Sequence, residues 1–256
     1  MAVAVRAGQY VHLLRDDGIG PPRRLPIPVE ATDRAGGLVS LVVPAGRDGW
    51  LARGRPGDGV GLMGPYGRPI ERDPRSRHLL LIAEGDRVAA LRLLMDEALA
   101  DGSQVVVLVG AATAREVYPS SLLPDEVEYV VATGDGTLGH RGEVVDVVGE
   151  FEAWADQSVA AASQPTLEAL ARLAAGRRER LGVAKLGRKR GGGRPDAPGS
   201  AAARRRAYLQ VIVDQSMGCA AGACLGCVVP AVGGQSLRAC REGPAFAVDE
   251  LDWEAG

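Results

Sequence analysis

Four cysteines lie within one short segment near the C-terminus, and the 256-residue chain contains no others. They are Cys219, Cys224, Cys227 and Cys240, in the stretch CAAGACLGCVVPAVGGQSLRAC, and their spacing is C-x4-C-x2-C-x12-C. Cysteine thiolates bind metal ions and iron–sulfur clusters, and paired cysteines form disulfides. The segment therefore predicts either a site where four thiolates meet one ligand or two disulfide bonds.

The cysteine spacing favours one of these chemistries. The first three cysteines match the C-x4-C-x2-C run that holds a [2Fe-2S] cluster in plant-type ferredoxins. Structural zinc sites generally use two C-x2-C pairs, and only Cys224 and Cys227 have that spacing here. Gly218, Gly222 and Gly226 leave room for backbone N–H groups to approach the sulfurs. We therefore predict a [2Fe-2S] cluster, with zinc as the first alternative and disulfides or free thiols as the second.

The remaining composition narrows the function classes. No apolar run is long enough to span a membrane, and Arg6 interrupts the N-terminal apolar stretch, so we expect neither a span nor a signal peptide and predict a cytoplasmic location. Aromatic residues make up only 4% of the chain, which argues against nucleic-acid binding. His12, His78 and His140 show no ligand spacing, and we expect them at the surface or at strand edges. No catalytic residue is predicted.

Two hydrophobic patterns precede the cysteines, and the strands and helices that they predict must position the cysteine segment. Short β-prone runs between about residues 8 and 67, separated by Gly/Pro turns, predict a small antiparallel barrel or sandwich. From residue 78 onward, strand patterns alternate with helix patterns, which predicts a parallel sheet covered on both faces, with ligands at the carboxyl ends of its strands. The strand patterns cover residues 78–83, 104–111, 126–136, 157–163 and 207–215, and the helix patterns cover 87–102, 142–155 and 165–176.

A basic segment, residues 176–206, separates the last helix pattern from the last strand pattern. It contains eleven Lys/Arg and two acidic residues, a charge of +9 in a chain whose formal net charge is −2. Its Gly, Pro and like charges predict an insertion without a fixed fold. The charge could attract an acidic partner or a nucleic acid, but no aromatic or folded recognition motif accompanies it, so a solvated loop is the simpler interpretation.

Several stretches resemble one known family. The cysteine segment, the closing LRACREGPAFAVDELDW, the stretch ATGDGTLGHRGEVVDVV, the run AGQYVHLL and the turn GPYG are similar to the electron-transfer subunit of B-type dihydroorotate dehydrogenase. The resemblance implies a multidomain α+β and α/β fold of the ferredoxin-reductase type. We expect a flavin-type antiparallel β-barrel, apparently truncated, at 1–75, a nucleotide-binding-like parallel α/β domain at 76–175, the basic insertion at 176–206, and a small [2Fe-2S] domain at 207–256.

The same resemblance implies a function and partners. Such a subunit passes electrons from NADH through FAD and the cluster to an FMN-containing catalytic subunit, in a heterotetramer-like assembly that oxidises dihydroorotate to orotate in pyrimidine biosynthesis. The chain would then be the electron-transfer component of an oxidoreductase rather than its substrate-oxidising subunit. The alternative is a non-redox accessory or docking protein of this family, with a structural metal site on the four cysteines.

The flavin motif departs from the family pattern Arg-Pro-(Ile/Phe)-Ser. The corresponding stretch is RRLPIPVEA, in which Leu25 stands in place of the Arg and Pro28 in place of the Ser. A neighbouring Arg could substitute, but Pro28 offers neither a hydroxyl nor an N–H. The sequence therefore leaves FAD binding open. The candidate FAD-binding residues are Arg24, Pro26, Ile27 and Gly49.

The nicotinamide motif departs further. Where the family has a Gly-rich turn after the first α/β strand, this chain has AEGDRVAA, with Glu84 and Asp86 at positions that should approach phosphates. An expected Cys-Gly-Pro turn is replaced by ASQP. We predict weak or absent NAD binding, and we expect Glu84 and Asp86 to cap the helix that begins near Arg87.

Overall fold

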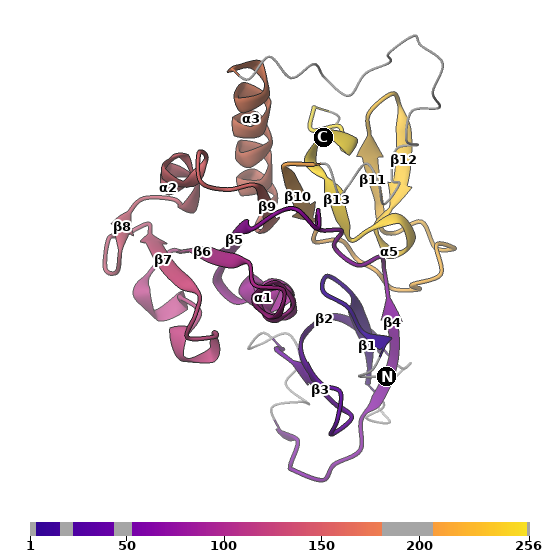
Figure 1. Cartoon of the computed structure of the whole chain (residues 1–256). Coiled ribbons are helices and arrows are strands. Elements are labelled where there is room, and N and C mark those ends of the chain that lie inside the picture. Colours follow the sequence, from indigo (N-terminus) through magenta and orange to yellow (C-terminus); the bar gives the residue numbers. More distant parts are fainter. Residues whose placement is uncertain (1–3, 16–22, 44–52, 181–206, 255–256) are drawn as a thin grey trace.

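The central feature of the computed structural model is a seven-stranded sheet (Figure 1). The structure describes residues 4–15, 23–43, 53–180 and 207–254. The strand order is β13-β10-β9-β5-β6-β7-β8, and the neighbouring strands are parallel except for the antiparallel pair of β10 and β13. The predicted parallel sheet is confirmed. Its strands are β5 (His78–Glu84), β6 (Gln104–Ala111), β7 (Glu128–Thr133), β8 (His140–Arg141), β9 (Gln157–Ala161), β10 (Leu209–Ile212) and β13 (Ala245–Ala247).

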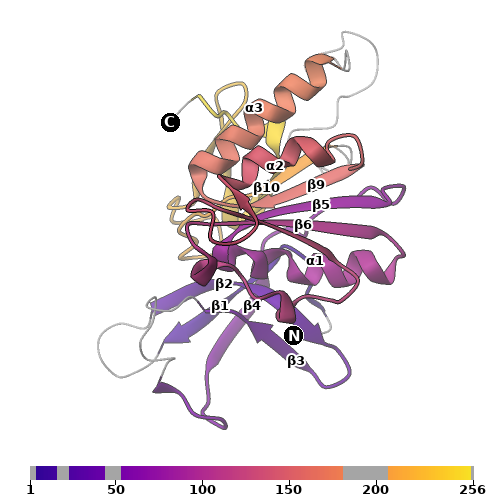
Figure 2. The same ribbon diagram turned by 90° about the vertical axis from the view of Figure 1, so that its left-hand side faces the viewer.

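Helices cover both faces of this sheet, because side chains along each buried strand alternate between the two faces. Leu79 and Leu81 belong to the core on the side of α1 (Ala89–Ala100), whereas Leu80 and Ile82 belong to the core beneath α2 (Val144–Phe151) and α3 (Gln164–Arg180). Figure 2 shows α1 between the central sheet and the N-terminal strands. The short 3-10 helices are η3 (Gly85–Val88), η4 (Ala114–Glu116), η5 (Ser120–Leu122) and η6 (Val248–Glu250).

The N-terminal strands form a second, antiparallel sheet rather than the predicted barrel. Within the described residues this sheet has the order β3-β2-β1-β4 and does not close on itself, so the barrel is not confirmed. Strand β2 was missed by the sequence patterns because it contains Pro26 and Pro28, which lack the N–H that a strand normally donates. The strands are β1 (Tyr10–Arg15), β2 (Arg23–Asp33), β3 (Leu38–Leu41) and β4 (Gly61–Tyr66).

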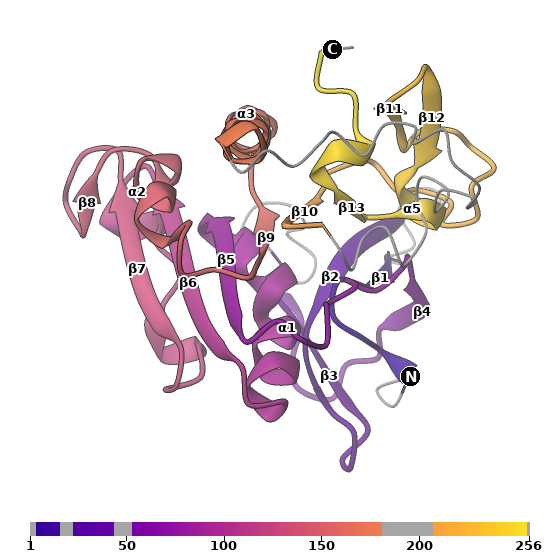
Figure 3. The ribbon, with the colours of Figure 1, turned by 45° about the horizontal axis from the view of Figure 1, so that its top comes forward.

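The cysteine segment leaves the central sheet and returns to it. It follows β10, folds into an antiparallel hairpin of β11 (Val228–Ala231) and β12 (Gln235–Arg238), continues into α5 (Ala239–Glu242), and rejoins the sheet as β13. Figure 3 shows this segment beside the ends of β1 and β4. Both ends of the cysteine segment are therefore fixed by hydrogen-bonded strands of the larger sheet.

The start of the basic segment differs from its prediction. Helix α3 continues to Arg180, so residues 176–180 are helical rather than part of an unstructured insertion. The guanidinium of Arg177 lies 3.7 Å from the ring centre of Tyr208, and Arg178 forms a 2.7 Å ion pair with Asp249. These contacts extend the helix, because they hold its last turn against the C-terminal segment. Residues 181–206 lie outside the described residues, so the rest of this prediction stays untested. No helix in the described chain is long and apolar enough to cross a membrane.

Two buried amides connect the segment after the N-terminal sheet to the central sheet. Gln210 of β10 accepts a hydrogen bond from the Glu71 N–H at 3.3 Å and donates one to the Glu71 carbonyl at 2.5 Å. Gln157 of β9 accepts one from the Asp73 N–H at 3.1 Å and donates one to the Ala207 carbonyl at 3.1 Å. Buried amides of this kind are expensive to break, because the groups left behind are shielded from water.

We therefore expect Gln210→Met to destabilise the fold. The substitution keeps the side-chain volume but removes both hydrogen bonds to Glu71, and the free energy of unfolding should fall by about 1–3 kcal/mol. Urea denaturation measures this. Gln104→Met, at the exposed start of β6, is the matched control and should change stability by less than about 0.5 kcal/mol. Equal effects of the two substitutions would contradict the role of Gln210.

Candidate metal centre and adjoining clefts

The hairpin register brings cysteines that are distant in sequence next to each other. In the β11–β12 pair, Val228 lies opposite Arg238, so Cys227 comes opposite Ala239, and Cys240 is the next residue along the chain. The Ala239 N–H donates to the Cys227 carbonyl at 2.9 Å and extends the pairing by one step. Cys227 and Cys240 are 1% and 2% exposed and belong to the core shared with α2 and α3.

The four thiols meet as two pairs. Cys219 accepts hydrogen bonds from the backbone N–H groups of Cys224, Ala221 and Ala223 and from the Cys224 thiol, and these lower the pKa of Cys219 to about 6. The Ala221 nitrogen lies 3.4 Å from its sulfur. In the second pair, burial and then the contact with Cys227 raise the pKa of Cys240 to about 12. One pair thus lies among N–H donors near the surface, whereas the other is buried.

The loop from Cys219 to Cys227 has the curvature that N–H donation to sulfur requires. Ala220 and Leu225 have φ values of +54° and +56°, which side chains other than glycine adopt rarely. Gly222 has φ +73°, and a Cβ there would lie 2.7 Å from Cδ of Arg241. A larger residue at position 222 would therefore collide with the Arg241 side chain. Elsewhere in the loop, a Cβ at Gly226 would come no closer than 3.7 Å to the Cys224 sulfur.

The pairwise arrangement of the thiols fits a site with two irons. A [2Fe-2S] cluster needs two thiolates on each iron, because the two bridging sulfides complete the tetrahedra. Cys219 with Cys224, and Cys227 with Cys240, supply two such pairs, and Cys219 is near enough to Cys240 to raise its pKa. The donor set present therefore fits the cluster that the spacing predicts.

A buried histidine ties the N-terminal sheet to this segment. His12 is 0% exposed, so its prediction as a surface or strand-edge residue is wrong. Burial lowers the pKa of His12, which favours the neutral ring, and Nε2 donates to the Met217 carbonyl across 2.7 Å. No local pattern indicates this contact, because the two residues are 205 positions apart.

A cleft of about 770 Å³ lies between the N-terminal sheet and the cysteine segment. Of the candidate FAD-binding residues, Arg24, Pro26 and Ile27 line it from β2, whereas Gly49 lies outside the described residues. The opposite wall comes from residues that the sequence did not single out. These are chiefly residues 212–217, Arg87 and Pro244.

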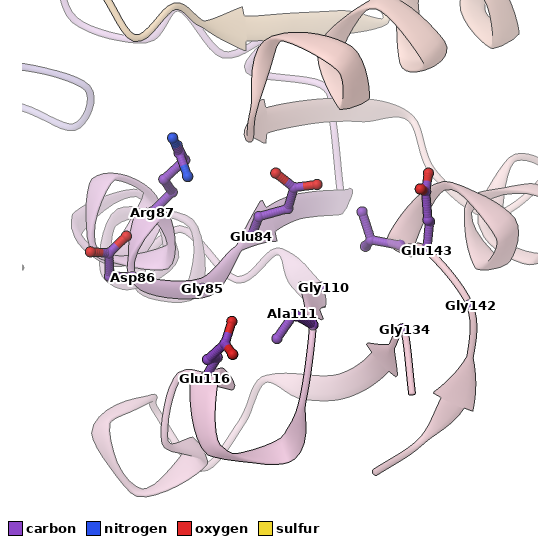
Figure 4. Close-up of a pocket in the computed structure, with 12 residues that line it drawn as sticks. Glu84, Gly85, Asp86, Arg87, Gly110, Ala111, Glu116, Gly134, Gly142 and Glu143 are labelled. Carbon is purple, nitrogen blue, oxygen red and sulfur yellow. The ribbon is translucent and has the colours of Figure 1, made fainter. Parts of the chain in front are cut away.

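A second cleft, of about 700 Å³, opens at the carboxyl ends of β5, β6 and β7, the edge where ligands of parallel sheets bind. Figure 4 shows four carboxylates around it, with Arg87 as the cationic side chain in its lining. Arg87 is itself paired with Asp214 at 3.2 Å. The carboxylates are those of Glu84, Asp86, Glu116 and Glu143.

Glu84 has a different partner from the one predicted. Its carboxylate accepts hydrogen bonds from the Ser163 N–H at 2.7 Å and from the Thr166 hydroxyl, at the N-terminus of α3. No side-chain hydrogen bond caps the helical turn that begins at Gly85. The expectation that Glu84 caps the helix near Arg87 is therefore wrong. The Glu84 carboxylate thus accepts one N–H and one hydroxyl at the N-terminus of α3, at the point between β5 and β9 where the strand order reverses.

The comparisons with known proteins agree with this geometry. Residues 214–252 match the family model described as the iron–sulfur cluster binding domain of dihydroorotate dehydrogenase B. The chain is 29% identical to the dihydroorotate dehydrogenase B (NAD(+)), electron transfer subunit, of Desulforamulus reducens, with 96% of this chain and 87% of that protein covered. The subunit of the same name from Bacillus velezensis is 27% identical, with coverages of 95% and 86%.

A solved structure extends the agreement to the fold. A chain in the structure of the NADH-dependent reduced ferredoxin-NADP oxidoreductase superposes with a TM-score of 0.75 at 21% identity, covering 99% of this chain and 82% of that one. The fold and the cysteine segment thus define a ferredoxin-reductase-like protein with a C-terminal iron–sulfur cluster binding domain. The chain is similar over nearly its whole length to the electron transfer subunits of dihydroorotate dehydrogenase B. The resemblance identified from the sequence is confirmed.

The loop geometry predicts that alanine at Gly222, but not at Gly226, lowers the iron content. Gly222→Ala should strain the backbone and push against Arg241, so less iron should be retained after purification. Gly226→Ala adds the same methyl group where only an ordinary van der Waals contact results, and it should retain wild-type iron. Iron per chain, measured by plasma emission on both variants, is the readout. Equal iron contents would contradict the role assigned to the loop curvature.

Proposed function

We propose that the chain is the electron-transfer component of an oxidoreductase and carries a [2Fe-2S] cluster on Cys219, Cys224, Cys227 and Cys240. The observation that carries the proposal is the meeting of the four thiols as two pairs, one of them surrounded by backbone N–H donors. The match of residues 214–252 to the iron–sulfur binding family supports it. No feature of the site supports the alternative of a non-redox docking protein.

Residues around the four cysteines would stabilise the negative charge of thiolates bound to a cluster. N–H groups of residues 221, 223 and 224 stabilise negative charge on Cys219, and the guanidinium of Arg238, held by Glu242 at 2.7 Å, lies near the buried pair. Burial of Cys227 and Cys240 keeps water from that side. A cluster there supplies one-electron transfer, and a flavin in the adjoining cleft supplies the exchange between one- and two-electron chemistry.

We assign the 770 Å³ cleft to FAD, with Arg24, Pro26, Ile27 and Gly49 as candidate binding residues. Arg24 is exposed on β2 and can reach a diphosphate, whereas Ile27 is buried and supports the cleft floor. The described N-terminal sheet would be the counterpart of a flavin barrel. We keep the units 1–75, 76–175 and 207–256, with the insertion beginning after α3 rather than at residue 176.

The relatives suggest the partner. Their name assigns them to dihydroorotate dehydrogenase B, so we propose a catalytic dehydrogenase subunit, FMN-containing by family resemblance, as the partner. Cys224 and Leu225, the latter 62% exposed, form the solvent-facing side of the cysteine loop, where such a partner would dock. A reducing, cytoplasmic compartment suits four unpaired thiols.

Replacing each cysteine in turn with Ser tests the ligand assignment. Each substitution removes one thiolate from a pair, so each should sharply lower cluster occupancy and loosen the C-terminal segment. Visible absorbance of the anaerobically purified variants measures occupancy, and proteolysis measures the loosening. Ser236→Ala, on exposed β12, is the control and should keep the colour of the wild type.

The outcomes of this series separate the two function classes. Loss of the cluster's visible bands in all four variants, with an unchanged Ser236→Ala, supports the electron-transfer assignment. A colourless wild-type protein with stoichiometric zinc and no sulfide would contradict it and favour the docking protein.

A further prediction concerns the nicotinamide nucleotide. Four carboxylates line the cleft at the strand ends, and Glu84 already occupies the N-terminus of α3, where an anion would otherwise bind. NADH should therefore bind weakly and reduce the isolated protein slowly, and electrons should enter or leave through a partner. An anaerobic NADH titration followed by flavin and cluster absorbance decides this. Rapid bleaching at micromolar NADH would contradict the prediction.

A further inference from the structure

Tyr10 lies between the two proposed cofactor positions. It sits on β1, lines the 770 Å³ cleft, and is only 2% exposed. Its ring centre is 5.7 Å from that of His12 and 5.9 Å from that of Tyr66. It also belongs to the same buried core as Cys227 and Cys240. One side chain thus lines the cleft and belongs to the core that contains the buried cysteine pair.

Two contacts hold the ring against the cysteine segment. The His12 bond to the Met217 carbonyl fixes the same face of β1 to the residues that precede Cys219. At Gly67, a Cβ would lie 3.1 Å from Cε1 of Tyr10 and 2.7 Å from Cδ of Pro244. The absence of a side chain at Gly67 therefore lets the Tyr10 ring approach the turn that follows α5, the helix that carries Cys240.

The Tyr10 hydroxyl is buried and, within the described residues, has no hydrogen-bond partner. A buried hydroxyl without an acceptor is costly, because it has given up its bond to water. Burial first, and then the thiols of Cys240, Cys227 and Cys219, raise the pKa of this hydroxyl. A phenol is protonated at neutral pH and can donate, and Tyr66 and three of the four cysteines lie near enough to influence it.

We propose that the Tyr10 hydroxyl donates a hydrogen bond to a sulfur of the cluster, on the side of the Cys227 and Cys240 pair, and thereby raises the reduction potential of the cluster. This inference rests on the proposed function, because it requires a [2Fe-2S] cluster at the four cysteines. Reduction adds one electron and makes the sulfurs more negative, so a hydrogen bond to them is stronger in the reduced form. No proton is transferred, and Tyr10 is a positioning residue that tunes the potential.

Tyr10→Phe tests the inference, because it removes only the hydroxyl. In the full-length, cluster-loaded protein, the equilibrium between oxidised and reduced cluster should shift by about tenfold toward the oxidised form, which is about 59 mV for one electron. A redox titration followed by electron paramagnetic resonance (EPR) gives the potential. Tyr208→Phe is the matched control: its hydroxyl is also buried without a described partner, but its ring lies against Arg177, and its potential should equal that of the wild type.

A second variant covers the case in which Tyr10→Phe loses its cluster. Fluorotyrosine introduced at position 10 keeps the hydroxyl and makes it a stronger donor, so the cluster potential should rise. An unchanged cluster potential in either Tyr10 variant, or a shift confined to the flavin, would overturn the inference while leaving the proposed function intact. Absence of iron and sulfide from the wild-type protein would instead overturn the proposed function, and this inference with it.

Discussion

The pairing of β11 with β12 is the interaction on which the site depends. It places Cys227 beside Cys240, although twelve residues separate them, and it does so with backbone hydrogen bonds that the intervening side chains do not alter. The pair can be buried only because β10 and β13 fasten both ends of the segment into the large sheet. The large sheet thus positions the cysteine site, although the cysteines themselves lie in the segment between two of its strands.

The same segment also closes the adjoining cleft. Residues 212–217 run from β10 toward Cys219 and form one wall of the cleft, whereas β2 of the N-terminal sheet forms the other. The bond between His12 of β1, the strand paired with β2, and Met217 connects the two walls. A cofactor in the cleft and a cluster on the cysteines would consequently be neighbours, separated by the Tyr10 ring, and the separation would be set by packing rather than by a flexible linker.

The sequence predicted those strands and helices whose hydrophobic pattern lies within a short stretch of the chain. The buried strands from His78 onward and the helices between them follow from hydrophobic periodicity, and the structure contains them. The cysteine spacing likewise predicts the type of ligand. Strand β2 was not predicted because its two prolines are unusual in a strand. It is a strand because it pairs with β1. The environments of His12 and Glu84 depend on contacts with residues far away in the chain, Met217 and Thr166, which no local pattern encodes.

The central claim is that two thiol pairs hold two irons. The most direct measurement is iron and acid-labile sulfide analysis of the anaerobically purified protein, combined with an EPR spectrum after reduction by dithionite. The account predicts about two irons and two sulfides per chain and the signal of a one-electron-reduced [2Fe-2S] cluster. One equivalent of zinc without sulfide, or iron without an EPR signal on reduction, would contradict it.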